Sequence, residues 1–193
     1  MTSPSTTPKA LFLDRDGVIN VDRDYVSRIE EFEFVDGIFD LCRAAQRDGY
    51  TLVVITNQAG IARGYFTEAD LATLTRWMID AFARERVTIA KVYACIYHPE
   101  APIERYRVDS FDRKPNPGML LRARDELSID LASSALIGDR LTDIEAGRRA
   151  GVGRLCYLQG TMRDVGLPGD DPALDGVIVC RSLADAAARL NFR

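Results

Sequence analysis

Histidine is almost absent from this sequence, and its scarcity excludes several classes of enzyme. The only histidine is His98. A zinc peptidase site of the HExxH type needs two histidines, and a Ser-His or Cys-His nucleophile pair would have to use His98. The sequence also contains no GxxxxGK[ST] phosphate loop. Catalysis by this chain would therefore rest on carboxylates, a lysine and a hard metal ion that binds oxygen ligands.

Long apolar runs and an excess of positive charge are missing as well. No apolar run approaches the roughly 18 residues that a membrane span requires, and segment 1–9 lacks the apolar stretch of a signal peptide. The formal net charge is −4, so we expect neither a nucleic-acid nor a membrane partner. The polar, proline-containing segment 1–9 is expected to be a disordered tail, followed by a single domain over 10–193.

Cysteine is scarce and follows no pattern. No two cysteines form a CxxC pair, which leaves four scattered thiols: Cys42, Cys95, Cys156 and Cys180. The last two lie in apolar stretches, where a thiol usually acts as a small buried side chain. Unpaired buried thiols are typical of a reducing compartment, so we expect the protein to be cytoplasmic.

Apolar runs alternate with amphipathic segments along the whole chain. Strands are predicted at 10–14, 50–56, 90–97, 134–139, 153–158 and 176–180, and helices at 37–49, 67–85, 117–127, 142–151 and 182–190. This alternation predicts a Rossmann-like three-layer α/β sandwich with a mostly parallel sheet between helices. The two long connections, 17–36 and 98–113, are too short for a separate cap domain, and long ordered loops are usually functional.

The stretch "LFLDRDGVIN" begins as a buried strand and then carries two carboxylates. Asp14 and Asp16 are two residues apart, so on an extended chain they point to the same face. At a separation of about 5 Å, two such charges repel by about 3 kcal/mol at an effective dielectric constant near 20. A chain that tolerates this repulsion needs compensating positive charge nearby.

Polar side chains follow several of the predicted strands. They are Asp14 and Asp16 after the first strand, Thr56, Asn57 and Gln58 after the second, Asp139 and Asp143 after the fourth, and Arg113 and Lys114 on the return from the third. Each alone is typical of a helix N-cap or of a solvated charge. Because ligands bind beyond the carboxyl ends of parallel strands, their joint occurrence predicts one site at this edge.

The motifs "FLDRDGVIN", "DYV", "TNQAGIARGYFTE", "RKPNPGM" and "GDRLTDIEAG" resemble a known family over residues 10 to 160. The order DxDG, strand-end Thr, Lys and GDxxxD is that of the haloacid-dehalogenase-like (HAD-like) phosphohydrolases. In detail the sequence is similar to the D-glycero-D-manno-heptose 1,7-bisphosphate 7-phosphatases, close relatives of the histidinol-phosphate phosphatases. The resemblance implies a cytoplasmic, monomeric phosphomonoesterase that removes the 7-phosphate in a bacterial heptose pathway feeding surface polysaccharide.

The resemblance also implies residue roles. Asp14 would attack phosphorus to form an aspartyl-phosphate, and Asp16 would protonate the leaving sugar oxygen and then activate water. Thr56 and Asn57 would bind phosphoryl oxygens, and Lys114 would neutralise charge in the transition state. A Mg²⁺ ion would be held by Asp14, the carbonyl of Asp16, and Asp139. Implied substrate contacts are Asp22, Tyr25, Asn57, Gln58, Arg113, Lys114 and Arg140, with Arg63 as a further candidate.

One family element is degenerate. Relatives carry a zinc loop of the form C-x-H…C-x-C, and here only Cys95 survives, with Tyr97, Ser110 and Asp112 at the other three positions. A structural zinc ion prefers four nitrogen or sulfur ligands. Cys95, His98 and Asp112 would form a poor substitute, so the loop is expected to fold without zinc.

Three other interpretations remain. Histidinol phosphate, or another small sugar phosphate, is the alternative substrate within the same enzyme class. A response-regulator receiver domain also groups acidic residues, a hydroxyl and a lysine around Mg²⁺, but it accepts phosphate on an aspartate after the third strand, where this chain has "CIYHP". A DxD glycosyltransferase would not explain Thr56, Lys114 and GDxxxD in this order.

Overall fold

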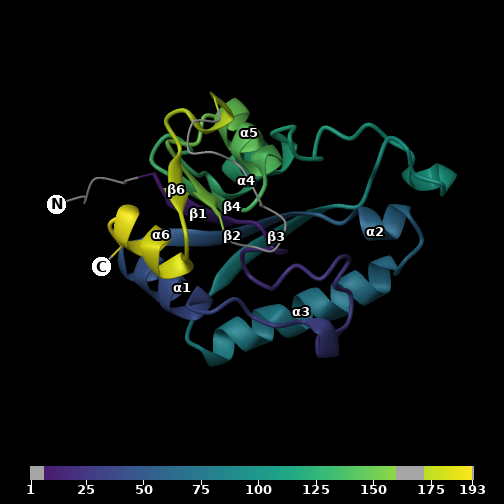
Figure 1. Cartoon of the computed structure of the whole chain (residues 1–193), viewed down its shortest axis with the longest axis horizontal. Helices are drawn as coiled ribbons and strands as arrows, with labels where there is room; N and C mark the ends of the chain where they lie inside the picture. Colours follow the sequence, from purple (N-terminus) through teal and green to yellow (C-terminus); the bar gives the residue numbers. More distant parts are fainter. Residues whose placement is uncertain (1–6, 160–171, 193) are drawn as a thin grey trace.

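The computed structural model describes residues 7–159 and 172–192, and a six-stranded parallel sheet forms its centre (Figure 1). The strand order is β3-β2-β1-β4-β5-β6. The strands are β1 (Lys9–Leu13), β2 (Tyr50–Asn57), β3 (Ile89–Cys95), β4 (Ala135–Gly138), β5 (Arg154–Leu158) and β6 (Ile178–Cys180). The helices are α1 (Ile38–Arg47), α2 (Ala59–Ala62), α3 (Glu68–Arg84), α4 (Gly118–Leu127), α5 (Leu141–Ala150) and α6 (Leu183–Arg189).

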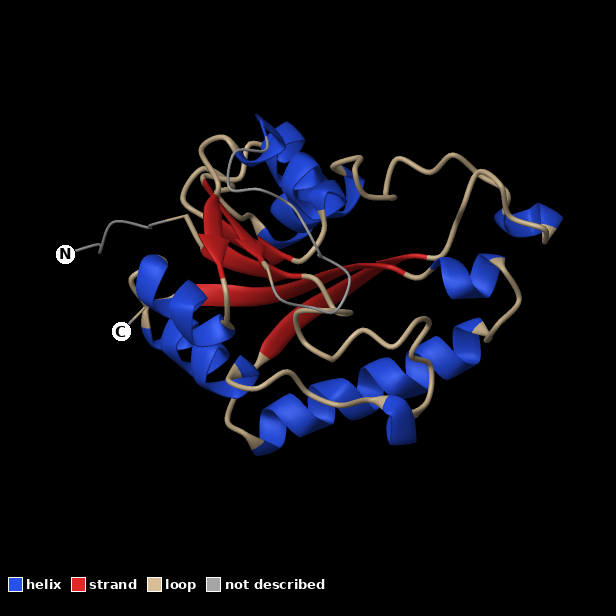
Figure 2. Cartoon of the chain, in the orientation of Figure 1, coloured by secondary structure: helices blue, strands red, loops and turns tan. Residues whose placement is uncertain are grey.

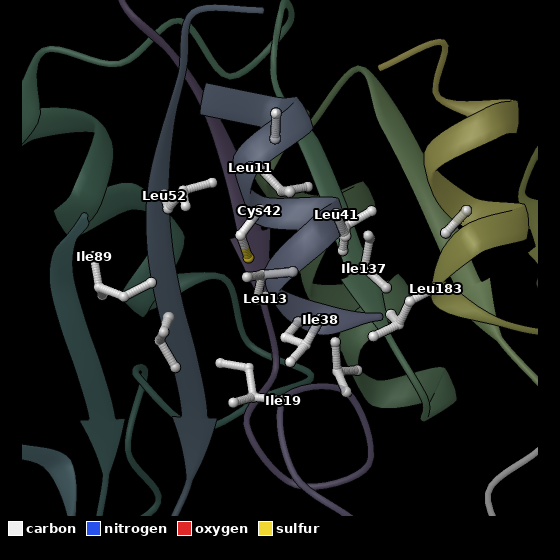
Figure 3. Packing of buried hydrophobic residues seen from close by; sticks show 14 of the residues in the cluster. Leu11, Leu13, Ile19, Ile38, Leu41, Cys42, Leu52, Ile89, Ile137 and Leu183 are labelled. Carbon is white, nitrogen blue, oxygen red and sulfur yellow. The ribbon is translucent and has the colours of Figure 1, made fainter. Parts of the chain in front are cut away.

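Helices cover both faces of this sheet, which confirms the predicted three-layer α/β sandwich (Figure 2). Alternate residues of each central strand point to opposite faces. Leu11 and Leu13 of β1 pack in a core with α1, α3 and α6, whereas Ala10 and Phe12 pack in a second core with α4 and α5. Figure 3 shows Leu11, Leu13 and neighbouring strand residues facing α1 in the first core.

The order of the strands determines where a ligand site can form. β1 pairs with β2 on one side and with β4 on the other, so the chain reverses its direction of winding at β1. The connections after β1 and after β4 therefore leave in opposite directions and open a crevice at their carboxyl ends. The strand-end residues singled out in the sequence lie at this crevice.

Two details differ from the sequence prediction. The prediction of a disordered tail over residues 1–9 is wrong for its last two residues. Lys9 belongs to β1 and pairs with Tyr50 of β2, and the Pro8 carbonyl accepts a hydrogen bond from Asp130 N at 2.8 Å. Residues 1–6 of that tail lie outside the described residues. Helix α2 was not predicted, since one turn of "AGIA" gives no helical periodicity. The predicted strands and the other five helices are present, with ends shifted by a few residues.

The long connections are tied to the core by their own apolar side chains. Val18, Ile19, Val26 and Phe32 anchor the connection between β1 and α1 in the first core. The connection between β3 and α4 contributes Tyr106 and others to a third cluster beside α2. Neither adds a second sheet within 7–159. The helices in the described part of the chain are all too short or too polar to cross a bilayer.

Candidate active site

Lys114 is a buried cation at the centre of the crevice. Its Nζ atom lies 2.9 Å from Asp14 Oδ1 and 2.6 Å from Asp143 Oδ1, and it donates a hydrogen bond to the Ile55 carbonyl at 3.1 Å. The lysine side chain is only 3% exposed. Burial opposes the charged form, but Asp14 and Asp143 outweigh it and raise the pKa of Lys114. The lysine is therefore a fixed positive charge that joins the tips of β1, β2 and α5.

Asn57 fixes the backbone of that lysine. The Asn57 Nδ2 group donates to the Lys114 carbonyl at 3.0 Å, and the Lys114 N–H donates to Asn57 Oδ1 at 3.1 Å. The side-chain amide thus pairs with a peptide group as a neighbouring strand would. The family resemblance implied a phosphoryl contact for Asn57; in the structure its side-chain amide holds the Lys114 backbone, and Asn57 also lines the cavity.

Three buried carboxylates gather around the lysine. Oxygen atoms of Asp14, Asp139 and Asp143 all lie within 4.8 Å of one another. Burial, with repulsion from Asp143, raises the pKa of Asp14 to about 7. Burial, with repulsion from Asp14 and Asp143, raises the pKa of Asp139 to about 8. One lysine does not balance three carboxylates, so the cluster has the charge and the oxygen donors that suit a divalent cation.

Two glycines make this crowding sterically possible. Gly17 has φ +89°, and a Cβ atom there would lie 2.0 Å from Asp139 Oδ2. At Gly138 a Cβ atom would lie 2.2 Å from the Asp143 Cβ atom. The glycines of "DRDG" and "GD" therefore permit the close approach of the two carboxylates.

The Asp16 carboxylate has a separate set of partners. Its Oδ1 atom accepts hydrogen bonds from Arg15 Nη2 at 2.9 Å, from Arg15 Nε at 3.3 Å and from Asn20 Nδ2 at 3.1 Å. Its Oδ2 atom accepts one from Gln58 Nε2 at 2.9 Å. Two protein cations therefore offset part of the repulsion between Asp14 and Asp16: Lys114 lies beside Asp14, and Arg15 lies beside Asp16.

A cavity of about 340 Å³ opens over these groups. It is lined by all predicted substrate contacts: Asp22, Tyr25, Asn57, Gln58, Arg63, Arg113, Lys114 and Arg140, together with Asp14 and Asp16. Thr56 and Asp139, which were also predicted, are buried beneath it and do not line it. Thr56 Oγ1 accepts a hydrogen bond from Gln58 Nε2 at 2.8 Å, which connects it to the same network as Asp16.

Arginines surround the mouth of the cavity. Arg63, Arg113 and Arg140 come from three different connections, and Arg140 Nη2 lies 2.9 Å from Asp22 Oδ2. Arg113 Nη1 donates to the Tyr97 carbonyl at 3.4 Å. Guanidinium groups suit phosphate because they donate two parallel hydrogen bonds to its oxygens. Three guanidinium groups therefore line the cavity, together with Asp22 and Asp24.

Sequence reasoning missed two residues of the site and one role. Arg15 and Asn20 hold Asp16, yet neither was singled out, and Asp143 was noticed but not assigned to Lys114. The available signal was a charged residue between two aspartates at the end of a buried strand, where its side chain points away from theirs. No sequence pattern marked Asn20.

The degenerate zinc loop has other contacts in place of a metal set. Cys95 Sγ faces the Tyr97 carbonyl at 3.9 Å, His98 Nδ1 accepts a hydrogen bond from Glu100 N at 3.1 Å, and Asp112 pairs with Arg122 at 2.6 Å. Over residues 7–159 and 172–192, only the Asp14, Asp139 and Asp143 group has the geometry to hold a metal through three such side chains.

This leads to a prediction about zinc. Protein purified without added metal should contain far less than one zinc per chain, because the loop lacks four nitrogen or sulfur ligands. Elemental analysis of the purified protein measures this directly. Treatment with a zinc-selective chelator should leave the melting temperature unchanged. Stoichiometric zinc, or a chelator-dependent loss of stability, would contradict the prediction.

The parallel sheet with aspartates at the tips of β1 and β4, a buried lysine and an arginine-rimmed cavity defines a HAD-like hydrolase. A sequence profile of the HAD-hydrolase-like family matches residues 111–186. The chain is 55% identical over 145 residues to the D-glycero-alpha-D-manno-heptose-1,7-bisphosphate 7-phosphatase of Burkholderia mallei, across 75% of this chain and 77% of the relative. It belongs to the heptose-1,7-bisphosphate 7-phosphatase family and is a phosphatase acting on phosphoric monoesters.

Other relatives agree with this assignment. The D-glycero-beta-D-manno-heptose-1,7-bisphosphate 7-phosphatase of Escherichia coli K12 is 51% identical over 144 residues, 75% of each chain. Among solved structures, a HAD-like phosphatase from Mesorhizobium loti matches with TM-score 0.83 and 36% identity, over 95% of this chain and 85% of that one. The D,D-heptose 1,7-bisphosphate phosphatase from B. bronchiseptica, complexed with magnesium and phosphate, matches with TM-score 0.78 and 31% identity, over 95% and 98%.

Proposed function

We propose that this chain removes the 7-phosphate of D-glycero-D-manno-heptose 1,7-bisphosphate through an aspartyl-phosphate intermediate. The observation that carries the proposal is the Asp14–Lys114 pair at 2.9 Å on the floor of an arginine-rimmed cavity. A carboxylate nucleophile is useful for phosphoryl transfer only where fixed positive charge lets a phosphate dianion approach it. The names of the relatives at 51–55% identity supply the sugar.

In the first step, an oxygen of Asp14 attacks phosphorus, and the bond between phosphorus and the sugar oxygen breaks. Asp16 gives its proton to the departing oxygen, so that an alcohol leaves rather than an alkoxide. In the second step, Asp16 takes a proton from water as the water attacks the phosphoryl group on Asp14. Inorganic phosphate and the free Asp14 carboxylate are the products. Both aspartates line the cavity, as this sequence of steps requires.

The groups around Asp14 bind the phosphoryl oxygens. Lys114 offsets the charge that spreads over these oxygens in the transition state. Thr56 Oγ1 accepts a hydrogen bond from Gln58 Nε2, so from below the cavity it supports Gln58, which lines the cavity and contacts Asp16. Asn57 keeps Lys114 in place through two backbone hydrogen bonds.

Magnesium fits the acidic cluster, and we propose that Asp14, Asp139 and the Asp16 carbonyl hold it. Asp143 is less suited to this role because Lys114 and the Arg140 N–H occupy its two oxygens, at 2.6 and 3.0 Å. Burial and mutual repulsion raise the pKa of both Asp14 and Asp139, which is relieved when a cation replaces their protons. The bound ion supplies positive charge that orients the phosphate and weakens its repulsion from Asp14.

Removing magnesium should abolish turnover. Dialysis against EDTA is expected to reduce the phosphate-release rate to background, because Lys114 alone leaves the cluster with net negative charge. Added Mg²⁺ should restore the rate, whereas Ca²⁺ should not, since it prefers longer bonds and more ligands. Activity that persists in EDTA at the full rate would contradict the proposed metal role.

The arginines at the mouth are suited to the second phosphate of the substrate, with Asp22 and Tyr25 beside the sugar. Arg140→Ala should raise KM for the bisphosphate about 10- to 100-fold, as loss of a charge-assisted hydrogen bond implies, with little change in kcat. Steady-state phosphate release measures both constants. Arg149 lies in α5, the helix that Arg140 precedes, and it pairs with Glu145 and Asn116 outside the cavity. Arg149→Ala is therefore a matched control and should leave KM unchanged.

The alternative substrate is histidinol phosphate, which lacks a second phosphate. The deciding experiment is a phosphatase screen over both heptose bisphosphate anomers, histidinol phosphate and fructose bisphosphate, with and without Mg²⁺. A heptose bisphosphate should give the highest kcat/KM. Relatives of similar identity are named for the alpha and for the beta anomer, so their names do not decide between the two. The same screen does, by comparing kcat/KM for the two anomers. Higher kcat/KM for histidinol phosphate would overturn the proposed substrate.

We further propose that the enzyme acts as a monomer in the cytoplasm, without a nucleic-acid or membrane partner. The four cysteines are free and buried, as is usual in a reducing compartment. The sugar phosphate is charged, so it stays in the compartment where it is made. Gel filtration with light scattering tests the monomer.

A further inference from the structure

Arg15 is a fully buried arginine that no part of the mechanism so far uses. Its side chain is 2% exposed and does not line the cavity. Nε and Nη2 donate to Asp16 Oδ1, and Nη2 also donates to the Val26 carbonyl at 2.8 Å. Nη1 is buried and has no hydrogen-bond partner among the described residues. The guanidinium therefore lies behind Asp16 on the side away from substrate.

Stability alone gives a weak reason for this arrangement. Burying an ion pair costs solvation, and an apolar side chain of similar size often stabilises a protein as well or better. An unpaired buried nitrogen adds a further cost. What the arginine does provide is a rigid, planar donor pair aimed at one carboxylate oxygen.

We propose that Arg15 is a positioning residue for the phosphatase reaction, which holds Asp16 so that its Oδ2 atom carries the proton exchanged with the sugar oxygen and with water. The inference rests on the proposed function of Asp16. Arg15 and Asn20 occupy Oδ1, at 2.9–3.3 Å and 3.1 Å. Within residues 7–159 and 172–192, the hydrogen bond to Oδ2 comes from Gln58, a residue of the cavity lining. The oxygen atom left for proton transfer is therefore the one beside the cavity.

The same guanidinium connects the acid to the loop that contacts the sugar. Val26, whose carbonyl accepts from Arg15, directly follows Tyr25 in the connection that also brings Asp22 to the cavity. One rigid group thus spans both features. Its removal is expected to disturb the placement of the proton donor first and the loop second, because two of its three hydrogen bonds go to Asp16.

The test uses two leaving groups. A sugar alkoxide needs a proton as it departs, whereas p-nitrophenolate does not, and kcat/KM reports the steps up to departure. Arg15→Met should lower kcat/KM for the heptose bisphosphate about 100-fold and for p-nitrophenyl phosphate by less than about 10-fold, within the range general acids contribute. In an Asp16→Asn background, Arg15→Met should lower kcat/KM for the heptose bisphosphate by less than about a further 3-fold, because the two residues act as a unit.

Two outcomes would overturn the proposal. One is an equal loss of kcat/KM on both substrates, and the other is a loss that adds in full to that caused by Asp16→Asn. If Arg15→Met does not fold, Arg15→Lys can replace it, because lysine keeps the charge but lacks the planar pair of donors. Arg15→Lys should also lower kcat/KM more for the heptose bisphosphate than for p-nitrophenyl phosphate, by a smaller factor than Arg15→Met. Arg23 lies in the same connection and pairs with Glu33. Arg23→Met is therefore the matched control, and it should leave kcat/KM unchanged for both substrates. If the unsubstituted enzyme does not cleave the heptose bisphosphate, the proposed substrate fails, and the comparison proceeds with an alkyl phosphate that it does cleave.

Discussion

Asp14→Asn should abolish turnover and leave the protein folded. An amide oxygen cannot form the acyl-phosphate, so kcat is expected to fall at least about 1,000-fold, as when other enzymes lose their nucleophile. Lys114 keeps its pair with Asp143 at 2.6 Å, so the substitution leaves no buried cation without a partner. Phosphate release with the heptose bisphosphate and Mg²⁺ measures the loss.

Stability provides the second half of this prediction. Burial and the nearby carboxylate of Asp143 raise the pKa of Asp14 to about 7, so above that pH the ionised group destabilises the folded metal-free protein. Asp14→Asn should therefore not lower the melting temperature at pH 8 without Mg²⁺. Asp125→Asn, on the exposed face of α4, is the control and should keep full activity. Retention of more than a tenth of kcat in Asp14→Asn would contradict the assigned nucleophile.

Lys114→Met should have the largest effect on stability. It leaves Asp14, Asp139 and Asp143 buried around an uncharged side chain, and removing one partner of a buried ion pair costs about 3–5 kcal/mol. The free energy of unfolding should recover part of this loss when Mg²⁺ is added, because the cation replaces some of the missing charge. Turnover should fall as well, since Lys114 stabilises the transferring phosphoryl group.

Urea unfolding with and without Mg²⁺ measures that prediction. Lys91→Met is a suitable control because Lys91 pairs with Glu126 at 3.1 Å on the surface, where an ion pair contributes at most about 1 kcal/mol. Equal destabilisation by the two substitutions, or no response of Lys114→Met to Mg²⁺, would show that Lys114 does not balance the acidic cluster.

Much of the fold was predictable because the sheet is buried on both faces. Strands such as β1 and β2 are then continuous apolar runs, and the helices between them carry one apolar face. The position of the site was predictable because the carboxyl ends of parallel strands converge at one edge of the sheet. That topology brings Asp14, Lys114 and Asp139 together. The family resemblance added their proposed roles.

The remaining features depend on contacts that no local pattern encodes. The contact between the Asn57 side chain and the Lys114 backbone depends on how the connection after β3 returns, 57 residues later. The burial of Arg15 depends on Val26, whose carbonyl is brought back by the β1–α1 connection. The same holds for Thr56, whose hydroxyl pairs with Gln58 below the cavity instead of lining it. Side-chain amides and guanidinium groups can hydrogen-bond to several kinds of partner, and the tertiary structure determines which partner lies within reach.

The two hydrogen bonds between Asn57 and Lys114 isolate the lysine from the connection that precedes it. They fasten the far end of the 96–113 excursion directly onto the tip of β2, at the residue where placement matters most. Changes of length or composition within that excursion are thereby insulated from the lysine. Grafting a foreign loop between Ile96 and Arg113 is therefore a feasible route to altered substrate selectivity that leaves Lys114 in place.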